Sequence, residues 1–124
     1  MKVEAVKPRV ERHERGGIAV VAPFGEHDLA TADAIRREIA AEPDRPVVVD
    51  LSGVSFIDSS VLGVLVEAQR MAAESGRGFA IVLGSTPPET VRRVLEITGL
   101  LRKLPIHATY DDARSAFAGH AEPA

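Results

Sequence analysis

The sequence predicts an α/β domain with a mainly parallel sheet of four to five strands, an N-terminal β-hairpin and four helices. Three observations support this fold class. Short apolar runs such as residues 47–51 and 79–83 are typical of buried strands, each is followed by a segment with helical spacing, and the loops between them are short. Strands that alternate with helices in this way form layers around a largely parallel sheet.

Several short segments are expected to form strands, because they are apolar or β-branched and are bounded by Gly or Pro. They lie at residues 9–13, 18–22, 47–51, 79–83 and 104–106. The turn Arg15-Gly16-Gly17 joins the first two as a hairpin, and Pro23 and Gly25 are expected to end the second. Pro105 places the last strand at an edge of the sheet.

The expected helices have apolar residues at helical spacing and begin at residues that cap helices. They run from Asp28 or Thr31 to the break at residues 42–46, from Ser60 to about Glu74, from Glu89 to Thr98, and from Tyr110 to Phe117. Gly99 is the expected C-cap of the third. We expect one domain at residues 9–118, with flexible tails at residues 1–8 and 119–124.

Composition narrows the functional classes. The 124 residues suffice for one core, and a net charge of -3 without a basic stripe gives no reason to expect direct nucleic-acid binding. No apolar run has the length of a membrane helix, so no membrane insertion is expected. The sequence has no cysteine, which excludes disulfides and thiolate chemistry. Together with a polar N-terminus, this favours a cytoplasmic location.

The most informative segment is residues 47–69. An apolar strand runs into Asp50, a loop with Ser and Gly follows, and the chain restarts at Asp58-Ser59-Ser60 as a strongly apolar helix. A serine at a helix N-terminus lies beside outward-pointing N–H groups and a dipole that favours negative charge. Such a serine can cap the helix, attack a substrate or accept a phosphate.

Parallel strands would bring three loops to one edge of the sheet. These loops follow the strands that end at Val21, Leu51 and Leu83, and they comprise residues 25–28, 58–60 and 84–86. Open α/β sheets place their functional surface at the carboxyl ends of the strands. The Asp58-Ser59-Ser60 turn is therefore expected to lie beside Asp28.

A set of segments also carries a family resemblance. It comprises Gly25-Glu26-His27-Asp28 with Thr31-Ala32, the run from Val48 to Ser52, the run from Phe56 to Gly63, and the ending from Gly99 through residues 104–106 to Ala113. Together these segments resemble the STAS domain family, and most closely its bacterial anti-sigma factor antagonists. The resemblance implies the STAS fold, with helices mostly on one face of the sheet. A glycine is usual in the family where this chain has Val61, and a leucine where it has His27.

The resemblance implies a regulatory protein, not an enzyme, that binds an anti-sigma factor serine kinase and releases its sigma factor. The kinase would phosphorylate the first serine after the aspartate, here Ser59, with Ser60 as the fallback. Phosphorylation would break the complex, and a phosphatase acting on phospho-Ser59 would reset it. The residues expected to contact the partner are Asp28, Asp58, Ser60, Val61, Leu62, Val64 and Met71. The family also contains accessory or scaffold subunits of transporters and signalling assemblies that have no sigma-factor control, which is the alternative role.

Capping and phosphorylation are compatible readings of this turn, because Asp58 can cap the helix while Ser59 stays exposed. A phosphate adds about -1.5 to -2 charges beside a helix N-terminus and opposite Asp58 and Asp28. On the helix itself, Val61, Leu65, Ala68 and Ala72 should face the sheet. Val64 and Met71 widen this apolar face on one side, and Leu62, Val66 and Ala73 widen it on the other. Each flank is either core or partner surface.

An enzyme is the competing class. Ser59 or Ser60 with His27 and Asp28 has the residue types of a hydrolase triad, but the Gly-x-Ser-x-Gly nucleophile pattern is absent. A phospho-acceptor aspartate at Asp50 lacks a neighbouring acidic pair for Mg²⁺. The sequence has no Walker pattern, and its scattered histidines do not have metal-ligand spacing. No cofactor or metal is expected, and the oligomeric state is either monomer or weak dimer.

Overall fold

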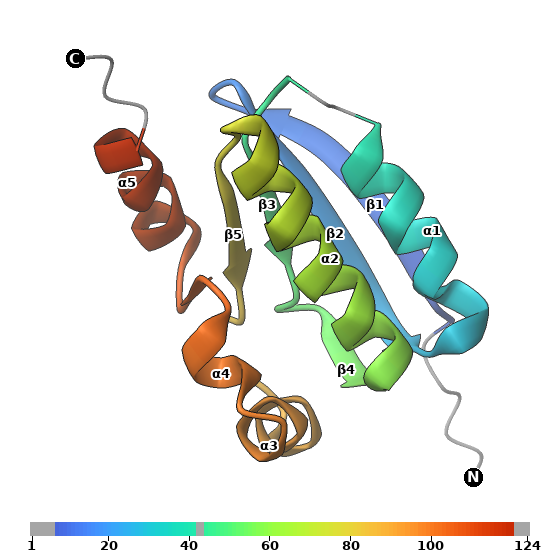
Figure 1. Cartoon of the computed structure of the whole chain (residues 1–124). Helices are drawn as coiled ribbons and strands as arrows, with labels where there is room; N and C mark the ends of the chain where they lie inside the picture. Colours follow the sequence, from blue (N-terminus) through green and yellow to red (C-terminus); the bar gives the residue numbers. More distant parts are fainter. Residues whose placement is uncertain (1–6, 42–43, 121–124) are drawn as a thin grey trace, which may run out of the picture.

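The structure, a computed structural model, describes residues 7–41 and 44–120, which adopt an α/β fold (Figure 1). The strands of the described part are β1 (Arg9–Arg15), β2 (Ile18–His27), β3 (Val47–Asp50), β4 (Val54–Ile57), β5 (Phe79–Val82) and β6 (Ile106–His107). The helices of the same part are α1 (Leu29–Ala40), α2 (Ser59–Ser75), α3 (Glu89–Ile97), α4 (Leu100–Lys103) and α5 (Tyr110–His120). The predicted fold class is therefore confirmed. Residues 1–6 and 121–124, most of the two expected tails, lie outside the described residues.

The sheet is mixed, with strand order β1-β2-β3-β5-β6, and β4 pairs with the far end of β2. β1 and β2 are antiparallel, and the other strand pairs are parallel, as predicted. The turn between β1 and β2 consists of Gly16 and Gly17, with φ of 60° and 83°. Only glycine adopts two successive positive φ values readily, and this backbone matches the twist of a two-residue hairpin.

Helices cover both faces of this sheet. The larger buried cluster lies under α1, α2 and α3 and includes Val21 and Val49 of the central strands. A smaller cluster lies under α5 and includes Val20, Val48 and Phe117. Because side chains of a strand point alternately to its two faces, neighbouring valines of β2 and β3 enter different clusters. Most of the helices thus pack on one face, as the family resemblance implied.

The second strand is longer than predicted, because Pro23 and Gly25 do not end it. β2 pairs with β3 as far as Val21 and with β4 from Gly25 onward, so Pro23 lies where β2 changes its partner. The missing N–H of proline is tolerated there because no partner on that side requires it. β4 itself was predicted as loop, and it forms because the extension of β2 supplies its pairing partner.

Other differences concern the C-terminal third of the chain. The third helix ends at Ile97 with Thr98 as its C-cap, and Gly99, at φ 78°, instead begins the short helix α4 that the sequence did not predict. The last strand lies at Ile106–His107 rather than at residues 104–106. The last helix runs beyond Phe117 to His120.

Candidate functional site

Two strand–aspartate–helix units lie side by side at one edge of the sheet. β2 ends at His27 and β4 ends at Ile57, and these two residues are paired in the parallel register. Each strand is followed by one aspartate, and each aspartate is the N-cap of the next helix, Asp28 for α1 and Asp58 for α2. Because paired parallel strands lie about 4.8 Å apart, the two helix N-termini are neighbours. The predicted meeting of the first two loops is confirmed.

Both aspartates cap their helices with the side chain. The Asp58 carboxylate accepts hydrogen bonds from the N–H groups of Ser60 at 2.9 Å and Val61 at 3.3 Å. The Asp28 carboxylate accepts from the Ala30 N–H at 2.9 Å, and the Asp28 N–H donates to the Thr31 hydroxyl at 3.1 Å, which completes a capping box. Asp28 and Thr31 were predicted as alternative caps of this helix. Both take part in the capping box, and Asp28 is the N-cap.

Ser59 is the first residue of α2, and its side chain is exposed. Because Asp58 satisfies the free N–H groups of the first turn, the Ser59 hydroxyl is not needed as a cap. This hydroxyl makes no hydrogen bond to any described residue. Ser60 is half-buried. Ser59 is therefore the more accessible of the two hydroxyl groups.

His27 is fully buried and belongs to the framework of this edge. Its Nε2 lies 2.9 Å from the Phe24 carbonyl oxygen, which can only accept, so Nε2 carries the proton and donates. Its Nδ1 lies 2.9 Å from the Thr31 hydroxyl, which donates to it when the ring is neutral. With both nitrogens occupied inside the protein, the ring cannot act as a base for Ser59, and the triad arrangement is not formed.

The predicted contact residues of α2 differ in their accessibility. Val61 and Leu62 are 0% and 4% exposed and belong to the main core, so burial removes both side chains from the expected partner surface. Val61 points into the core and does not crowd the exposed side of the turn. The predicted sheet-facing positions Leu65, Ala68 and Ala72 are also buried, as expected.

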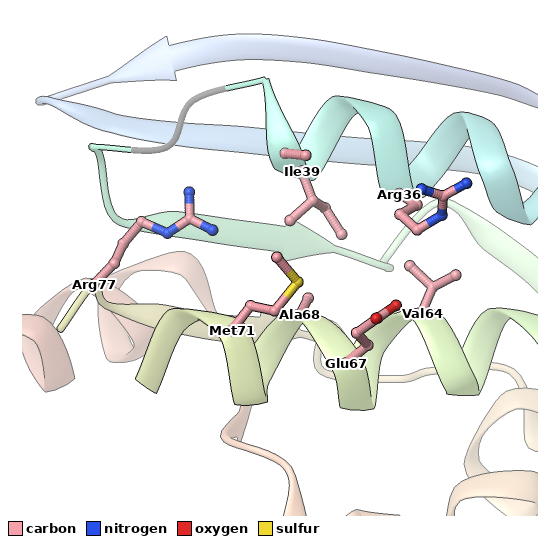
Figure 2. A pocket seen from close by; sticks show the side chains of 8 residues that line it. Arg36, Ile39, Val64, Glu67, Ala68, Met71 and Arg77 are labelled. Atoms are coloured by element: carbon pink, nitrogen blue, oxygen red, sulfur yellow. The ribbon is translucent and has the colours of Figure 1, made fainter. Parts of the chain in front are cut away.

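Val64 and Met71 lie on the flank of α2 that faces α1. Figure 2 shows Met71 opposite Ile39 and Val64 opposite Arg36, at a small cleft of about 40 Å³ between the two helices. Val64 is half-buried, whereas Met71 is 50% exposed. At a rise of about 1.5 Å per residue, Met71 lies about 18 Å along α2 from Ser59, so it is remote from the serine turn.

The third loop lies against the turn that follows β3. A Cβ atom built on Gly84 would meet the Cβ atom of Ser52 at 3.2 Å, which places this loop against the turn after β3. The helix that follows the loop does reach β4, because the Thr90 hydroxyl donates to the Ser55 carbonyl oxygen at 2.9 Å. The predicted convergence is thus confirmed for the first two loops.

Sequence reasoning missed two exposed apolar side chains that lie close in sequence to the capping aspartates. Leu29, the first residue of α1, is 76% exposed, and Phe56 of β4 is 42% exposed. Phe56 pairs with Glu26 of β2, one position before the two capped turns. Their position in the sequence could have identified them, because each residue lies within three residues of a capping aspartate. Large apolar side chains exposed near a polar turn are typical of contact surfaces.

The same edge is acidic. Glu26, Asp28 and Asp58 lie there, and within residues 7–41 and 44–120 none of the three forms an ion pair. The described residues also contain no cluster of His, Asp or Glu suited to a metal ion, and no described helix is long and apolar enough to span a membrane. The site is thus an exposed hydroxyl framed by carboxylates and two apolar side chains.

Comparison with known proteins gives a consistent result. Residues 9–113 match the model of the STAS domain family. The chain is 30% identical over 103 residues to an anti-sigma F factor antagonist of Paenibacillus polymyxa, covering 80% of this chain and 86% of the relative. It is 29% identical over 109 residues to an anti-sigma-F factor antagonist of Mycobacterium tuberculosis, covering 86% of each. The crystal structure of an anti-sigma factor antagonist from Mycobacterium paratuberculosis superimposes with a TM-score of 0.75, at 30% identity, covering 89% of this chain and 93% of that one.

Proposed function

Because the chain belongs to the STAS domain family, we propose that it is an anti-sigma factor antagonist controlled by phosphorylation of Ser59. In its unmodified form it binds an anti-sigma factor serine kinase, and the sigma factor held by that kinase is released. Phosphorylation of Ser59 ends the binding, and a phosphatase restores it. The observation that carries this proposal is the exposed Ser59 hydroxyl, which Asp58 leaves free by capping α2 itself.

Charge explains how one phosphate can dissociate the complex. The phosphate brings about -1.5 to -2 charges to an edge that already holds Glu26, Asp28 and Asp58 without ion pairs. Because a partner surface that fits the neutral hydroxyl offers no counter-charge, binding would dehydrate the phosphate, which costs several kcal/mol per buried ion. A tenfold loss of affinity requires only ~1.4 kcal/mol.

The partner surface that we propose is centred on the two capped turns and differs from the predicted one, because the buried Val61 and Leu62 are not part of it. Asp28, Asp58 and Ser60 stay in it, and the exposed Leu29 and Phe56 add apolar contact area. Val64 and Met71 continue it along the cleft shown in Figure 2. A complementary partner surface has apolar pockets for Leu29 and Phe56 and fits a neutral hydroxyl at Ser59.

The phosphorylation step is tested with the purified anti-sigma factor serine kinase of the same organism, ATP and intact-protein mass spectrometry. We expect the natural chain to gain one phosphate and the Ser59→Ala variant to gain none. The matched control, Ser60→Ala, keeps its phosphate because it leaves the exposed hydroxyl in place. A phosphate that persists in Ser59→Ala and disappears in Ser60→Ala would transfer the role to Ser60.

Binding to the same kinase is measured by calorimetry with two variants of equal size. Ser59→Asp places a negative charge at the switch and is expected to weaken binding at least tenfold, whereas Ser59→Asn, which is neutral, weakens it less. Equal affinities for the two variants would contradict the electrostatic mechanism. A natural chain that does not bind the kinase at all would contradict the antagonist role and favour the accessory-subunit alternative.

A further inference from the structure

β1 is one edge of the sheet (Figure 1), and within residues 7–41 and 44–120 no strand pairs with its outer side. Residues 11–15 of this strand are all exposed, and the strand carries the sequence Arg9-Val10-Glu11-Arg12-His13-Glu14-Arg15. An edge strand presents a row of N–H and C=O groups to which another strand can pair. Proteins commonly protect such edges with charges, so the signs and positions of the charges decide whether pairing is blocked or directed.

The hydrogen bonds of β2 identify which β1 residues face outward. The Ala19 N–H donates to the Pro46 carbonyl oxygen at 2.9 Å, so Ala19 directs its backbone groups toward β3. Successive residues of a strand direct these groups to alternate sides, so Ile18 and Val20 face β1. Their partners are Arg15 and His13, which therefore face β2. By the same alternation, Val10, Arg12 and Glu14 present their N–H and C=O groups at the free edge.

One antiparallel register of two β1 strands satisfies these backbone groups and pairs the most charges. A register centred on Val10 opposes only Arg9 to Glu11, because β1 begins at Arg9. Registers centred between two residues would oppose an outward-facing residue to an inward-facing one, and the hydrogen bonds would not form. Centring on Glu11, Arg12 or Glu14 places that residue opposite its own copy, which opposes like charges. Centring on His13 instead opposes Arg12 to the second copy's Glu14, and Glu11 to the second copy's Arg15.

We propose that β1 pairs with β1 of a second copy of this chain in the register centred on His13. The resulting dimer has a two-fold axis perpendicular to the sheet, and the sheet continues from one copy into the other. Each unlike pair occurs twice, so four charge pairs join the two strands. This proposal does not depend on the role of Ser59.

Contacts within each copy already hold these charged side chains at the edge. On the α1 face, Arg12 pairs with Glu38 at 3.0 Å and Glu14 pairs with Arg45 at 2.8 Å, so each cross-strand Arg12–Glu14 pair would join two such pairs into a network of alternating sign. On the opposite face, Glu11 pairs with Arg9 at 2.8 Å, and the Arg15 guanidinium lies 3.9 Å from the centre of the Tyr110 ring. Networks of this kind stabilise more than isolated surface pairs do.

The expected dimer is weak, because two short strands bury less surface than the ~1,200 Å² of a stable interface. Analytical ultracentrifugation of the full chain over a wide concentration range is therefore the first measurement. We expect reversible dimerisation that weakens as salt is added, because the charge pairs are exposed. Sedimentation as a monomer at every concentration would overturn the proposal.

A charge exchange tests the register. Glu11→Arg and Arg15→Glu each oppose like charges twice in the dimer, and each is expected to weaken dimerisation roughly tenfold. The double variant Glu11→Arg/Arg15→Glu restores unlike pairs and is expected to recover most of the affinity. Thermal unfolding of all three variants checks that the monomer remains folded. A double variant as weak as the single variants would overturn the proposed register.

Amide exchange followed by NMR tests the backbone pairing without any substitution. In the dimer, the N–H groups of Arg12 and Glu14 gain partners in the second copy, so their protection should rise with protein concentration. His13 and Arg15 already face β2, and their protection should change little. A dimer in which protection does not alternate along β1 would contradict the proposal.

Discussion

At the scale of single residues, neighbouring side chains of the Asp58-Ser59-Ser60 turn have separate roles. Asp58 accepts the hydrogen bonds that the start of α2 requires, and Ser59 keeps its hydroxyl exposed. A serine that capped the helix would hold its hydroxyl oxygen against the N–H groups of the first turn, where it would be less accessible to a kinase. The separation of tasks lets the charge at Ser59 change while the helix end stays intact.

The exposed Leu29 gives a residue-scale prediction with a close control. Leu29→Ser should weaken binding of the proposed kinase partner about tenfold or more, because burying an exposed leucine contributes about 1.5–3 kcal/mol. Ile97 is equally exposed, at 76%, but it lies at the end of α3 away from the Thr90 contact with β4. Ile97→Ser should leave the affinity unchanged. Calorimetry decides, and equal losses in both variants would contradict the proposed surface.

At the scale of elements, the site depends on β4 and on the turn that leads into it. The Gly25 N–H of β2 donates to the Gly53 carbonyl oxygen at 3.0 Å, at the point where β2 leaves β3 and takes β4 as its partner. A Cβ atom on Gly53 would overlap the ring of Phe24. A residue without a side chain is therefore required here for β4 to reach β2 and for Asp58 to lie beside Asp28.

Two glycine-to-alanine substitutions should have opposite effects on stability. Gly53→Ala should lower the free energy of unfolding by about 1–3 kcal/mol, because the added methyl group forces the Phe24 ring to move. Gly63 lies inside α2, and a Cβ atom there meets nothing within 4 Å. Gly63→Ala should raise the free energy of unfolding by about 0.5–1 kcal/mol, because alanine favours the helix. Urea denaturation measures both, and a neutral Gly53→Ala would show that Phe24 moves without cost.

Local signals explain which elements could be predicted. The helices other than α4 were found because capping residues and helical spacing are short-range features. Ser59 was found because its turn lies within such a feature. β4 was missed because its two inner residues, Ser55 and Phe56, are both exposed, which breaks the alternation of a half-buried strand. Its partner, β2, lies far away in the sequence. The exposure of Leu29 and the burial of Leu62 could not be predicted either, since both depend on how the helices pack.

At the scale of the whole molecule, the two buried clusters differ in size and in how they are covered. The cluster under α1, α2 and α3 includes Leu65 at its centre, with 0% exposure. The cluster under α5 is smaller, and Phe117 provides much of its cover, lying close to Gly78. Loss of the first cluster removes the support of both capped turns, whereas loss of the second frees mainly one helix.

This difference predicts two patterns of hydrogen exchange. Leu65→Ala should lower the free energy of unfolding by about 2–5 kcal/mol and speed exchange in all protected elements, because the sheet and the helices share that core. Phe117→Ala should speed exchange chiefly in α5. Mass spectrometry of the two variants distinguishes the patterns. Uniform acceleration in Phe117→Ala would show that α5 and the main core unfold together.

One contact bears on how the chain folds as it is made. The Tyr110 hydroxyl donates to the Arg15 carbonyl oxygen at 2.9 Å, and the two residues are 95 positions apart in the sequence. Nascent chains grow at about 5–20 residues per second, so Tyr110 is synthesised several seconds after the hairpin of β1 and β2. During that interval the valines that α5 later shields remain open to water. A nascent chain stalled before Tyr110 should therefore be especially prone to aggregate.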